Sequence, residues 1–225
     1  MCPLSLVHII SYFCMFLKFL LSYFLFFYMM KIMRNKKQIH LDKPIVMVGL
    51  MGAGKTSIGR ALARSLGIPF VDSDKEIEKA AGCSVIDIFS MYGEKEFRRV
   101  EEKVIERLID TAPNIKVIST GEGAFITNSV RQIVLEKALT IWLKADLELL
   151  VKRTNFRHTR PQLLNTDSRE ILAQLIKDRY DTYALADITV ETRDENIHKT
   201  LSKVLNAIEQ YLNKQKQGEQ NENRK

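Results

Sequence analysis

The stretch Gly49-Leu50-Met51-Gly52-Ala53-Gly54-Lys55-Thr56 decides the fold of this chain. It matches the pattern G-x-x-x-x-G-K-S/T, a loop whose backbone N–H groups surround a phosphate. Residues 44–48, before it, are typical of a short buried strand, and residues 57–66, after it, have apolar side chains at helical spacing. A helix that begins directly after the glycines adds the partial positive charge of its N-terminus. Together these features predict a nucleoside triphosphate site.

Each polar position of this phosphate loop (residues 49–56) has a physical role in binding a triphosphate. Lys55 would reach the β- and γ-phosphates, and the hydroxyl of Thr56 would bind Mg²⁺. We therefore expect ATP and Mg²⁺ as ligands. The residues expected to hold the nucleotide phosphates are Gly52, Ala53, Gly54, Lys55, Thr56 and Ser57.

Composition limits the function classes. The 225 residues suit one domain with appendages, and 46% are hydrophobic, enough for a sizeable core. The net charge of +7 is concentrated at the start, because residues 1–44 hold six basic residues and one acidic residue. The remaining chain has 28 basic and 26 acidic residues, which does not indicate a nucleic-acid binder. Of the three cysteines only Cys83 lies outside the first thirty residues, so no disulfide framework is indicated.

Residues 1–38 form a hydrophobic and then basic leader. Residues 9–30 are long enough to cross a bilayer, which needs about 20 residues. A cleavable signal peptide fits poorly, since a basic start and a small-residue exit are both missing. The leader is a membrane anchor, a segment without function, or a wrongly assigned start with translation beginning at Met30 or Met33. We favour the wrong start, because the composition resembles translated AT-rich non-coding sequence. In every case we expect the nucleotide site in the cytoplasm.

Two acids follow the second expected strand. Asp72 and Asp74 come after the short apolar segment 68–71 and open a helix over 75–81. Ligands of open α/β sheets bind at the carboxyl ends of strands, so both acids are placed to face the phosphate loop. One could hold Mg²⁺ through water, and the other could take a proton from an acceptor hydroxyl. The alternative is that either acid only caps the helix.

A long helix is expected over 94–110, after Gly93 ends a short helix over 84–89. Arg98 and Glu101 are neighbours on it at i, i+3. The simpler interpretation is a surface ion pair. The alternative is a guanidinium that grips a substrate carboxylate in a bidentate fork and is held in position by the glutamate.

The rest of the chain continues the alternation of strands and helices. A strand over 114–119 ends at a glycine-rich turn over 120–124, where a ligand can approach the backbone closely. The basic segment about 153–164 is an exposed loop, a nucleic-acid patch or, in a phosphate-transferring enzyme, a lid that brings an arginine to the phosphate. The other expected elements are a helix over 129–138, a strand over 139–143, a helix over 146–153, a helix over 168–179, a strand over 186–190 and a helix over 197–211. Residues 213–225 are polar and are expected to be disordered.

Five segments follow the phosphate loop in order. They are Val71-Asp72-Ser73-Asp74, Gly93-Glu94-Lys95-Glu96-Phe97-Arg98-Arg99-Val100-Glu101, Ser119-Thr120-Gly121-Glu122-Gly123-Ala124, Arg160-Pro161-Gln162-Leu163-Leu164 and Arg179-Tyr180. Together these segments resemble shikimate kinases. The resemblance covers about residues 39–212 and implies an α/β fold of the P-loop kinase type, with a five-stranded parallel sheet flanked by helices and a mobile lid. It implies transfer of the γ-phosphoryl of ATP to the 3-hydroxyl of shikimate, on the route to chorismate, by a monomer.

The resemblance also implies roles at the nucleotide end of the site. Lys55 and the lid residue Arg160 would act on the transferred phosphoryl group. Thr56 would bind Mg²⁺, with Asp72 helping through water. Arg153 lies where the family packs a side chain on adenine.

At the acceptor end, Asp74 would touch the substrate hydroxyls and act as the base. Arg98 and Arg179 would clamp the shikimate carboxylate, with Glu101 orienting Arg98. The glycines would line the ring of the substrate. The residues implied to bind shikimate are Asp74, Arg98, Glu101, Gly121, Gly123 and Arg179.

One position departs from the family pattern, which has three consecutive glycines where Glu122 is the middle residue here. If this position needs a positive φ, the substitution costs about 1 kcal/mol or more. A carboxylate there would also lie near a bound acid. We therefore predict that the Glu122 side chain turns outward while its N–H still serves the substrate.

Two other functions compete with this one. A related kinase of gluconate or a nucleotide would lack the helix carrying residues 97–99 together with Arg179, and this chain has both. A non-catalytic ATP-binding module would be favoured if Asp74 or Arg160 were missing, and neither is.

Overall fold

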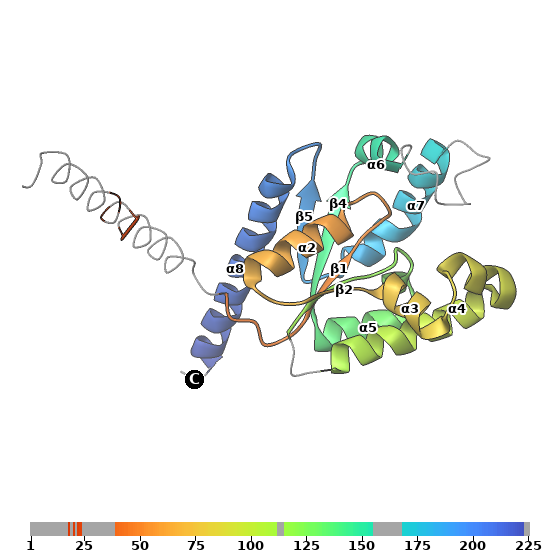
Figure 1. Ribbon diagram of the computed structural model, residues 1–225, viewed down its shortest axis with the longest axis horizontal. Coiled ribbons are helices and arrows are strands. Elements are labelled where there is room, and N and C mark those ends of the chain that lie inside the picture. The colour runs from red at the N-terminus through yellow and green to blue at the C-terminus, as the bar shows by residue number, and fades with distance from the viewer. Residues whose placement is uncertain are drawn as a thin grey trace, which may run out of the picture. The chain divides into compact units, whose positions relative to one another are not determined.

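The computed structural model describes residues 18, 20, 22–23, 39–111, 115–154 and 168–222 (Figure 1). By its contacts the chain divides into a unit of residues 1–40 and a unit of residues 41–225. Among the described residues, no helix combines the length and the apolar character that crossing a membrane requires. The candidate membrane span over 9–30 lies almost wholly outside the described residues, as do Arg160 and most of the expected lid.

The second unit is built on five parallel strands, as the sequence predicts. In the order β2-β3-β1-β4-β5 every neighbouring pair is parallel. The central strand β1 is completely buried, which explains why its sequence is a continuous apolar run. The strands are β1 Ile45–Val48, β2 Phe70–Asp72, β3 Val117–Ser119, β4 Leu139–Ala145 and β5 Ile188–Thr192.

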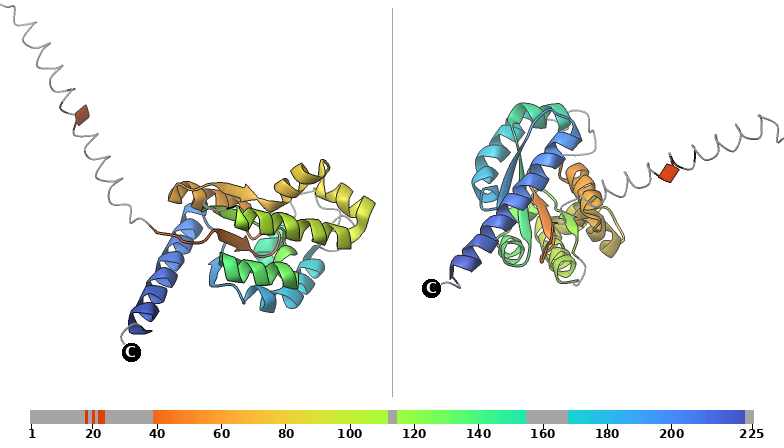
Figure 2. Two further views of the ribbon diagram at one scale, coloured as in Figure 1. Left: turned by 90° about the horizontal axis from the view of Figure 1, so that it is seen from below. Right: turned by 90° about the vertical axis from the view of Figure 1, so that its left-hand side faces the viewer.

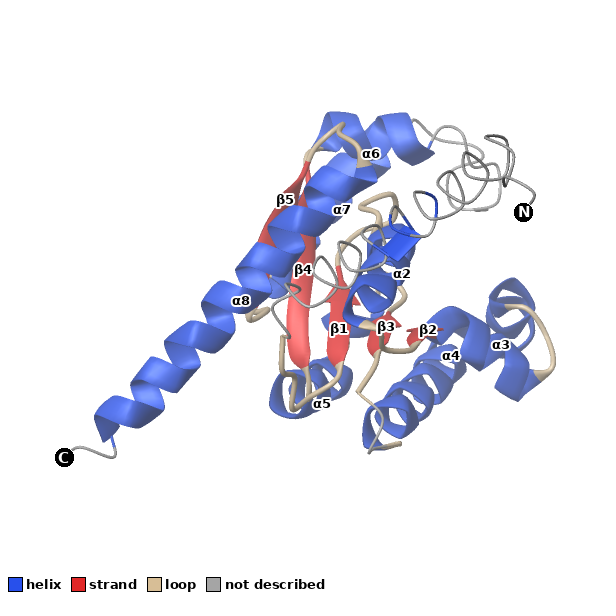
Figure 3. Cartoon of the chain, turned by 60° about the vertical axis from the view of Figure 1, so that its left-hand side comes forward, coloured by secondary structure: helices blue, strands red, loops and turns tan. Residues whose placement is uncertain are grey.

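Helices cover both faces of this sheet (Figures 1 and 3). The connection from β1 to β2 runs one way across the sheet, and the later connections run the other way. Because such crossovers are right-handed, α2 lies on the opposite face from the helices of the later connections. On its own face α2 packs against α8. The helices are α2 Lys55–Leu66, α3 Ser73–Ala81, α4 Val85–Asp110, α5 Asn128–Lys137, α6 Leu147–Thr154, α7 Ser168–Tyr183 and α8 Ile197–Glu222, with a 3₁₀ turn η1 Ala124–Ile126.

The strand register brings three strand ends to one place. Met47 of β1 pairs with Ser119 of β3, and Ser119 pairs with Asp72 of β2. Beyond Met47 the chain ends β1 and enters the phosphate loop. Beyond Ser119 it enters the turn that follows β3, and beyond Asp72 it enters α3. Three segments far apart in the sequence therefore meet at the carboxyl edge of the sheet, where open α/β folds bind ligands.

Helices α4 and α8 are both longer than the sequence predicts. Gly93 is expected to separate two helices, but it lies instead at a kink inside α4, where it has the non-helical values φ 77° and ψ 173°. The expected disorder of residues 213–225 is wrong for most of that tail, because α8 continues to Glu222 and extends beyond the other helices (Figure 2). The tail is polar, but its Gln, Lys and Glu residues favour helix, and a packed helix precedes it.

Candidate active site

The phosphate loop has the backbone that anion binding requires. Gly52 and Gly54 have φ values of 78° and 100°, and Gly54 is the residue immediately before α2. Because Gly54 has no side chain to cap the helix, the first N–H groups of α2 remain directed at the loop. The Lys55 ammonium donates hydrogen bonds to the carbonyl oxygens of Gly49, at 2.7 Å, and Leu50, at 3.0 Å. Lys55 thus lies across the loop that it would share with a phosphate.

A cavity of about 390 Å³ opens at this loop. All six residues expected to hold the phosphates line it, together with Asp72, Asp74 and Gly121. Arg153 lines it as well, and its guanidinium donates to Gly52 O at 3.3 Å and Arg193 O at 3.1 Å. The sequence did not point to the residues that complete the wall beyond Arg153, which are Thr192, Glu195, Ile197 and Thr200.

The two residues expected to hold Mg²⁺ lie together. The Thr56 hydroxyl donates to the Asp72 carboxylate over 3.3 Å and lies 3.4 Å from the Ser119 hydroxyl. Asp72 precedes α3, but its side chain makes no capping hydrogen bond there, so the capping interpretation does not account for it. Among the described residues no cluster of three or more His, Cys, Asp or Glu could hold a metal. One hydroxyl and one carboxylate fit Mg²⁺, which usually keeps several waters and takes phosphate oxygens as further ligands.

Arg98 and Glu101 form a buried ion pair rather than a surface one. Arg98 Nη1 donates to Glu101 Oε2 at 2.7 Å, and the Glu101 side chain is only 1% exposed. Burial raises the pKa of the Glu101 carboxyl, against the opposing effect of Arg98. Burial lowers the pKa of Arg98, but its hydrogen bonds and charge interactions with Glu101 and Glu94 outweigh this, so that its pKa is raised overall. Arg98 is therefore a cation whose guanidinium is held in place by the buried Glu101 carboxylate.

The turn Gly121-Glu122-Gly123 (the glycine turn) lies against both of these side chains. A Cβ on Gly121 would lie 2.8 Å from Asp74 Oδ1 and 3.1 Å from Glu101 Oε1, and a Cβ on Gly123 would overlap the Arg98 guanidinium. Space, not backbone conformation, therefore requires these two glycines, since neither has a positive φ. Among the described residues only glycines have a positive φ, so Glu122 does not have the strain that a positive φ would impose on its backbone.

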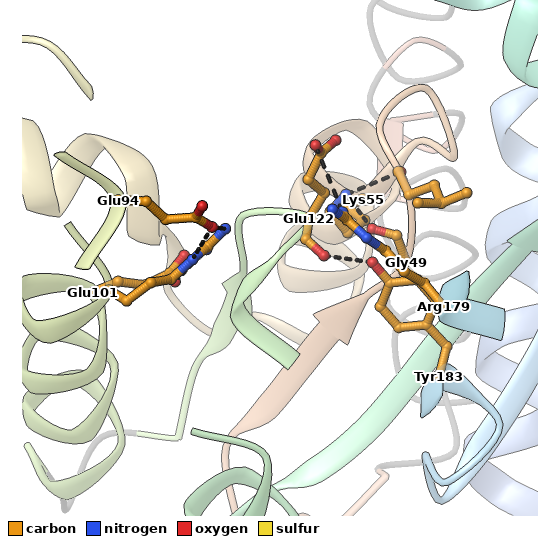
Figure 4. Close-up of polar contacts among 9 residues, drawn as sticks. Gly49, Lys55, Glu94, Glu101, Glu122, Arg179 and Tyr183 are labelled. Carbon is orange, nitrogen blue, oxygen red and sulfur yellow. Dashed lines mark hydrogen bonds and ion pairs between the residues drawn. The ribbon is translucent and has the colours of Figure 1, made fainter. Parts of the chain in front are cut away.

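The prediction that Glu122 turns outward is wrong. Its side chain is 15% exposed, and Oε1 lies 3.8 Å from Arg179 Nη1, whose side chain is 23% exposed. Figure 4 shows Glu122 turned toward Arg179, on the far side of the turn from Glu94 and Glu101. A bound acid would repel the Glu122 carboxylate, but in the folded protein the nearby Arg179 guanidinium attracts it.

Tyr183 supports the glycine turn from α7, and sequence reasoning missed it. Its hydroxyl donates to the carbonyl oxygen of Glu122, and its ring stacks with those of Phe125 and Trp142. Burial raises the pKa of Tyr183, so the hydroxyl remains a proton donor. The spacing offered a signal, because a tyrosine four residues after Arg179 lies on the same face of a helix.

The predicted residues thus fall into two groups. The nucleotide group lines the cavity with Asp74 and Gly121. Arg98, Glu101, Gly123 and Arg179 lie outside that lining, but Arg98 contacts Gly123 and Arg179 pairs with Glu122, so both arginines meet the same turn. Arg160 lies outside the described residues.

Comparisons with known proteins agree with this geometry. The family model described as shikimate kinase matches residues 51–209. A shikimate kinase of Paramagnetospirillum magneticum is 47% identical over 176 residues, which are 78% of this chain and 89% of that protein. One of Mesorhizobium japonicum is 45% identical over 167 residues, 74% of this chain and 81% of that protein. The solved structure of an Acinetobacter baumannii shikimate kinase in complex with shikimate has a TM-score of 0.68 and 35% identity, covering 72% of this chain and 90% of that one. The chain belongs to the shikimate kinase family.

Proposed function

We propose that this enzyme transfers the γ-phosphoryl of ATP to the 3-hydroxyl of shikimate with the residue roles predicted from its sequence. The observation that carries the proposal is the glycine turn, which contacts Asp74 and Arg98 and pairs with Arg179 through Glu122. An acid and two guanidinium groups around one turn suit a small polyhydroxy acid, whose hydroxyl must lose a proton and whose carboxylate needs cationic partners.

At the nucleotide end, the amides of the phosphate loop and Lys55 hold the β- and γ-phosphates. Thr56 and Asp72, which lie within 3.3 Å of each other, would hold Mg²⁺, and the ion would neutralise charge on the phosphate oxygens. Lys55 exchanges its contacts with Gly49 and Leu50 for phosphate oxygens when the nucleotide binds. Arg153 packs on the adenine, and Arg160 brings further positive charge to the transferred group.

At the acceptor end, Asp74 takes the proton of the 3-hydroxyl as that oxygen attacks the γ-phosphorus, and ADP leaves from the opposite side. Arg98 and Arg179 bind the carboxylate of shikimate. Glu101 keeps Arg98 aimed, because their 2.7 Å contact is buried and fixes one edge of the guanidinium. Gly121 and Gly123 leave room for the ring beside Asp74 and Arg98. The enzyme acts in the cytoplasm as a monomer.

A coupled ADP-release assay tests this proposal. The full chain is supplied with ATP, Mg²⁺ and, in separate reactions, shikimate, gluconate or a nucleoside monophosphate. We expect turnover with shikimate and, at most, background ADP release with the other two. Equal or faster turnover with gluconate or a nucleotide would contradict the proposal, and ADP release independent of every acceptor would indicate an ATPase.

A further inference from the structure

Glu122 places a negative charge inside a site that would receive a negatively charged acceptor. Its carboxylate is mostly buried, and Arg179 is a cation beside it, at 3.8 Å. A glycine at this position, as in the family pattern, would leave Arg179 without that carboxylate. The glycine turn of this chain therefore carries its own anion for one of the two acceptor-binding arginines.

The contact between the two side chains is loose for a buried ion pair. The Glu122–Arg179 separation of 3.8 Å is beyond hydrogen-bond distance, whereas Arg98 and Glu101 are 2.7 Å apart. Within the described part of the chain, Arg179 Nη1 is buried and has no hydrogen-bond partner. A planar guanidinium binds a carboxylate best through two parallel N–H···O bonds. A better-placed carboxylate could therefore replace Glu122 at Arg179.

The backbone of Glu122 is held independently of its side chain. The Tyr183 hydroxyl donates to the Glu122 carbonyl oxygen, and the N–H of the preceding Gly121 donates to the Ser73 hydroxyl at 3.3 Å. The side chain can leave Arg179 by rotation about its own bonds while the turn stays in place. Gly121 and Gly123, which contact Asp74 and Arg98, need not move.

We propose that Glu122 is an internal competitor for the acceptor carboxylate. It pairs with Arg179 in the free enzyme, and an acid must displace it in order to bind. Glu122 is thus a positioning residue that sets acceptor affinity and keeps a buried guanidinium paired when no substrate is present. The inference rests on the proposed function, because it requires that Arg179 binds the acceptor carboxylate.

The competition has a measurable cost. If only a fraction of the enzyme has Arg179 released, the apparent dissociation constant rises in inverse proportion to that fraction. A pair formed in about nine-tenths of molecules weakens binding about tenfold. This cost falls on ligands whose negative charge binds Arg179, and it leaves the chemical step largely unchanged.

Titration calorimetry on the full chain and on Glu122→Gln tests the inference with two ligands, shikimate and its neutral carboxamide. Glutamine keeps the length of the side chain and removes its charge. We expect Glu122→Gln to bind shikimate about five- to tenfold more tightly and the carboxamide with unchanged affinity. Glu122→Asp keeps the charge but shortens the side chain and so weakens a contact that is already long, at 3.8 Å. We therefore expect an intermediate gain in affinity for shikimate.

Glu148→Gln is the matched control. Glu148 also pairs with an arginine of α7, Arg169, but its side chain is 70% exposed and does not line the cavity. We expect that variant to bind both ligands as the wild type does. If Glu122→Gln bound shikimate more weakly, or tightened both ligands equally, the inference would be wrong. The inference alone would be overturned if the wild type turned over shikimate and Glu122→Gln had the same dissociation constant for shikimate as the wild type. The proposed function would be overturned if the wild type were inactive on shikimate.

Discussion

Arg98 and Arg99 are adjacent and chemically identical, yet their surroundings differ. The Arg98 side chain is 25% exposed and faces the buried Glu101, whereas Arg99 is 66% exposed and pairs with Glu96 at the surface. The phase of α4 decides which of them reaches the glycine turn. From spacing alone either arginine could form a helix ion pair, and only the fold shows which pair is buried.

Asp74 offers the sharpest test of chemistry at a single residue. We expect Asp74→Asn to lower kcat by about 10²- to 10⁴-fold, since a carboxamide cannot accept the hydroxyl proton. ATP binding should stay nearly intact, because the phosphate loop does not change. Steady-state kinetics and equilibrium nucleotide binding measure the two effects separately. Asp74→Glu should recover part of the activity, and turnover near the wild-type rate in Asp74→Asn would remove the base assignment.

Glu101 predicts a pH dependence of stability. Burial raises its pKa above the ordinary value of 4.5, so the folded protein keeps a proton that the unfolded chain has already lost. As the pH rises from the pKa of Glu101 in the unfolded chain to its higher pKa in the folded protein, this carboxyl therefore lowers the free energy of unfolding. Glu101→Gln cannot titrate, so we expect the free energy of unfolding of the wild type, minus that of Glu101→Gln, to fall from acid to neutral pH. Urea denaturation at several pH values measures it, and a difference that rose instead would show that Arg98 lowers the pKa of Glu101.

At the scale of elements, the Gly93 kink predicts a stability effect. Its φ of 77° with ψ of 173° suits only glycine, although a Cβ there would meet nothing within 4 Å. Gly93→Ala should therefore cost about 1 to 3 kcal/mol through backbone strain alone. Gly218, near the end of α8, also has open space around it but no positive φ. We therefore expect Gly218→Ala to leave the free energy of unfolding unchanged or to raise it by up to about 1 kcal/mol. Denaturant unfolding compares them, and equal effects would contradict this reasoning.

The sequence predicted those elements whose signal is local. The phosphate loop and the starts of the helices expected at residues 84 and 146 depend on residues close in sequence, and the structure has all three. Ser84 and Asp87 form a capping box at the first of these helices, and Asp146 accepts a hydrogen bond from the Leu149 N–H at the second. The direction of the Glu122 side chain depends on α7, more than fifty residues later, and no local pattern encodes it. The strand order likewise depends on pairing between distant segments, which the sequence did not specify.

At the scale of the whole molecule, β1 connects the two halves of the site. The phosphate loop leaves its end directly, and the Met47 carbonyl oxygen accepts hydrogen bonds from both the N–H and the hydroxyl of Thr120, just before the glycine turn. One buried strand therefore fixes the phosphate loop and the glycine turn relative to each other. Placement and charge, on which phosphoryl transfer mainly depends, are thus set by the most rigid part of the fold.

The unit of residues 41–225 contains every described residue of the proposed site. We expect a chain that begins at Met33 to have the same kcat and the same KM for ATP and shikimate as the full chain, because no described residue of the leader belongs to the proposed site. The same coupled assay on both chains tests this. A loss of activity in the shorter chain would give the leader a role in folding or catalysis and would argue against a wrongly assigned start.

The central claim is that Arg98 holds the acceptor carboxylate at the glycine turn, and Arg98→Lys tests it most directly. Lysine keeps the charge but loses the planar fork, so kcat/KM for shikimate should fall by about ten- to a hundredfold while the KM for ATP stays the same. Arg99→Lys, its exposed neighbour, should stay within about twofold of the wild type. If Arg98→Lys and Arg99→Lys had the same kcat/KM for shikimate, the claim would be contradicted.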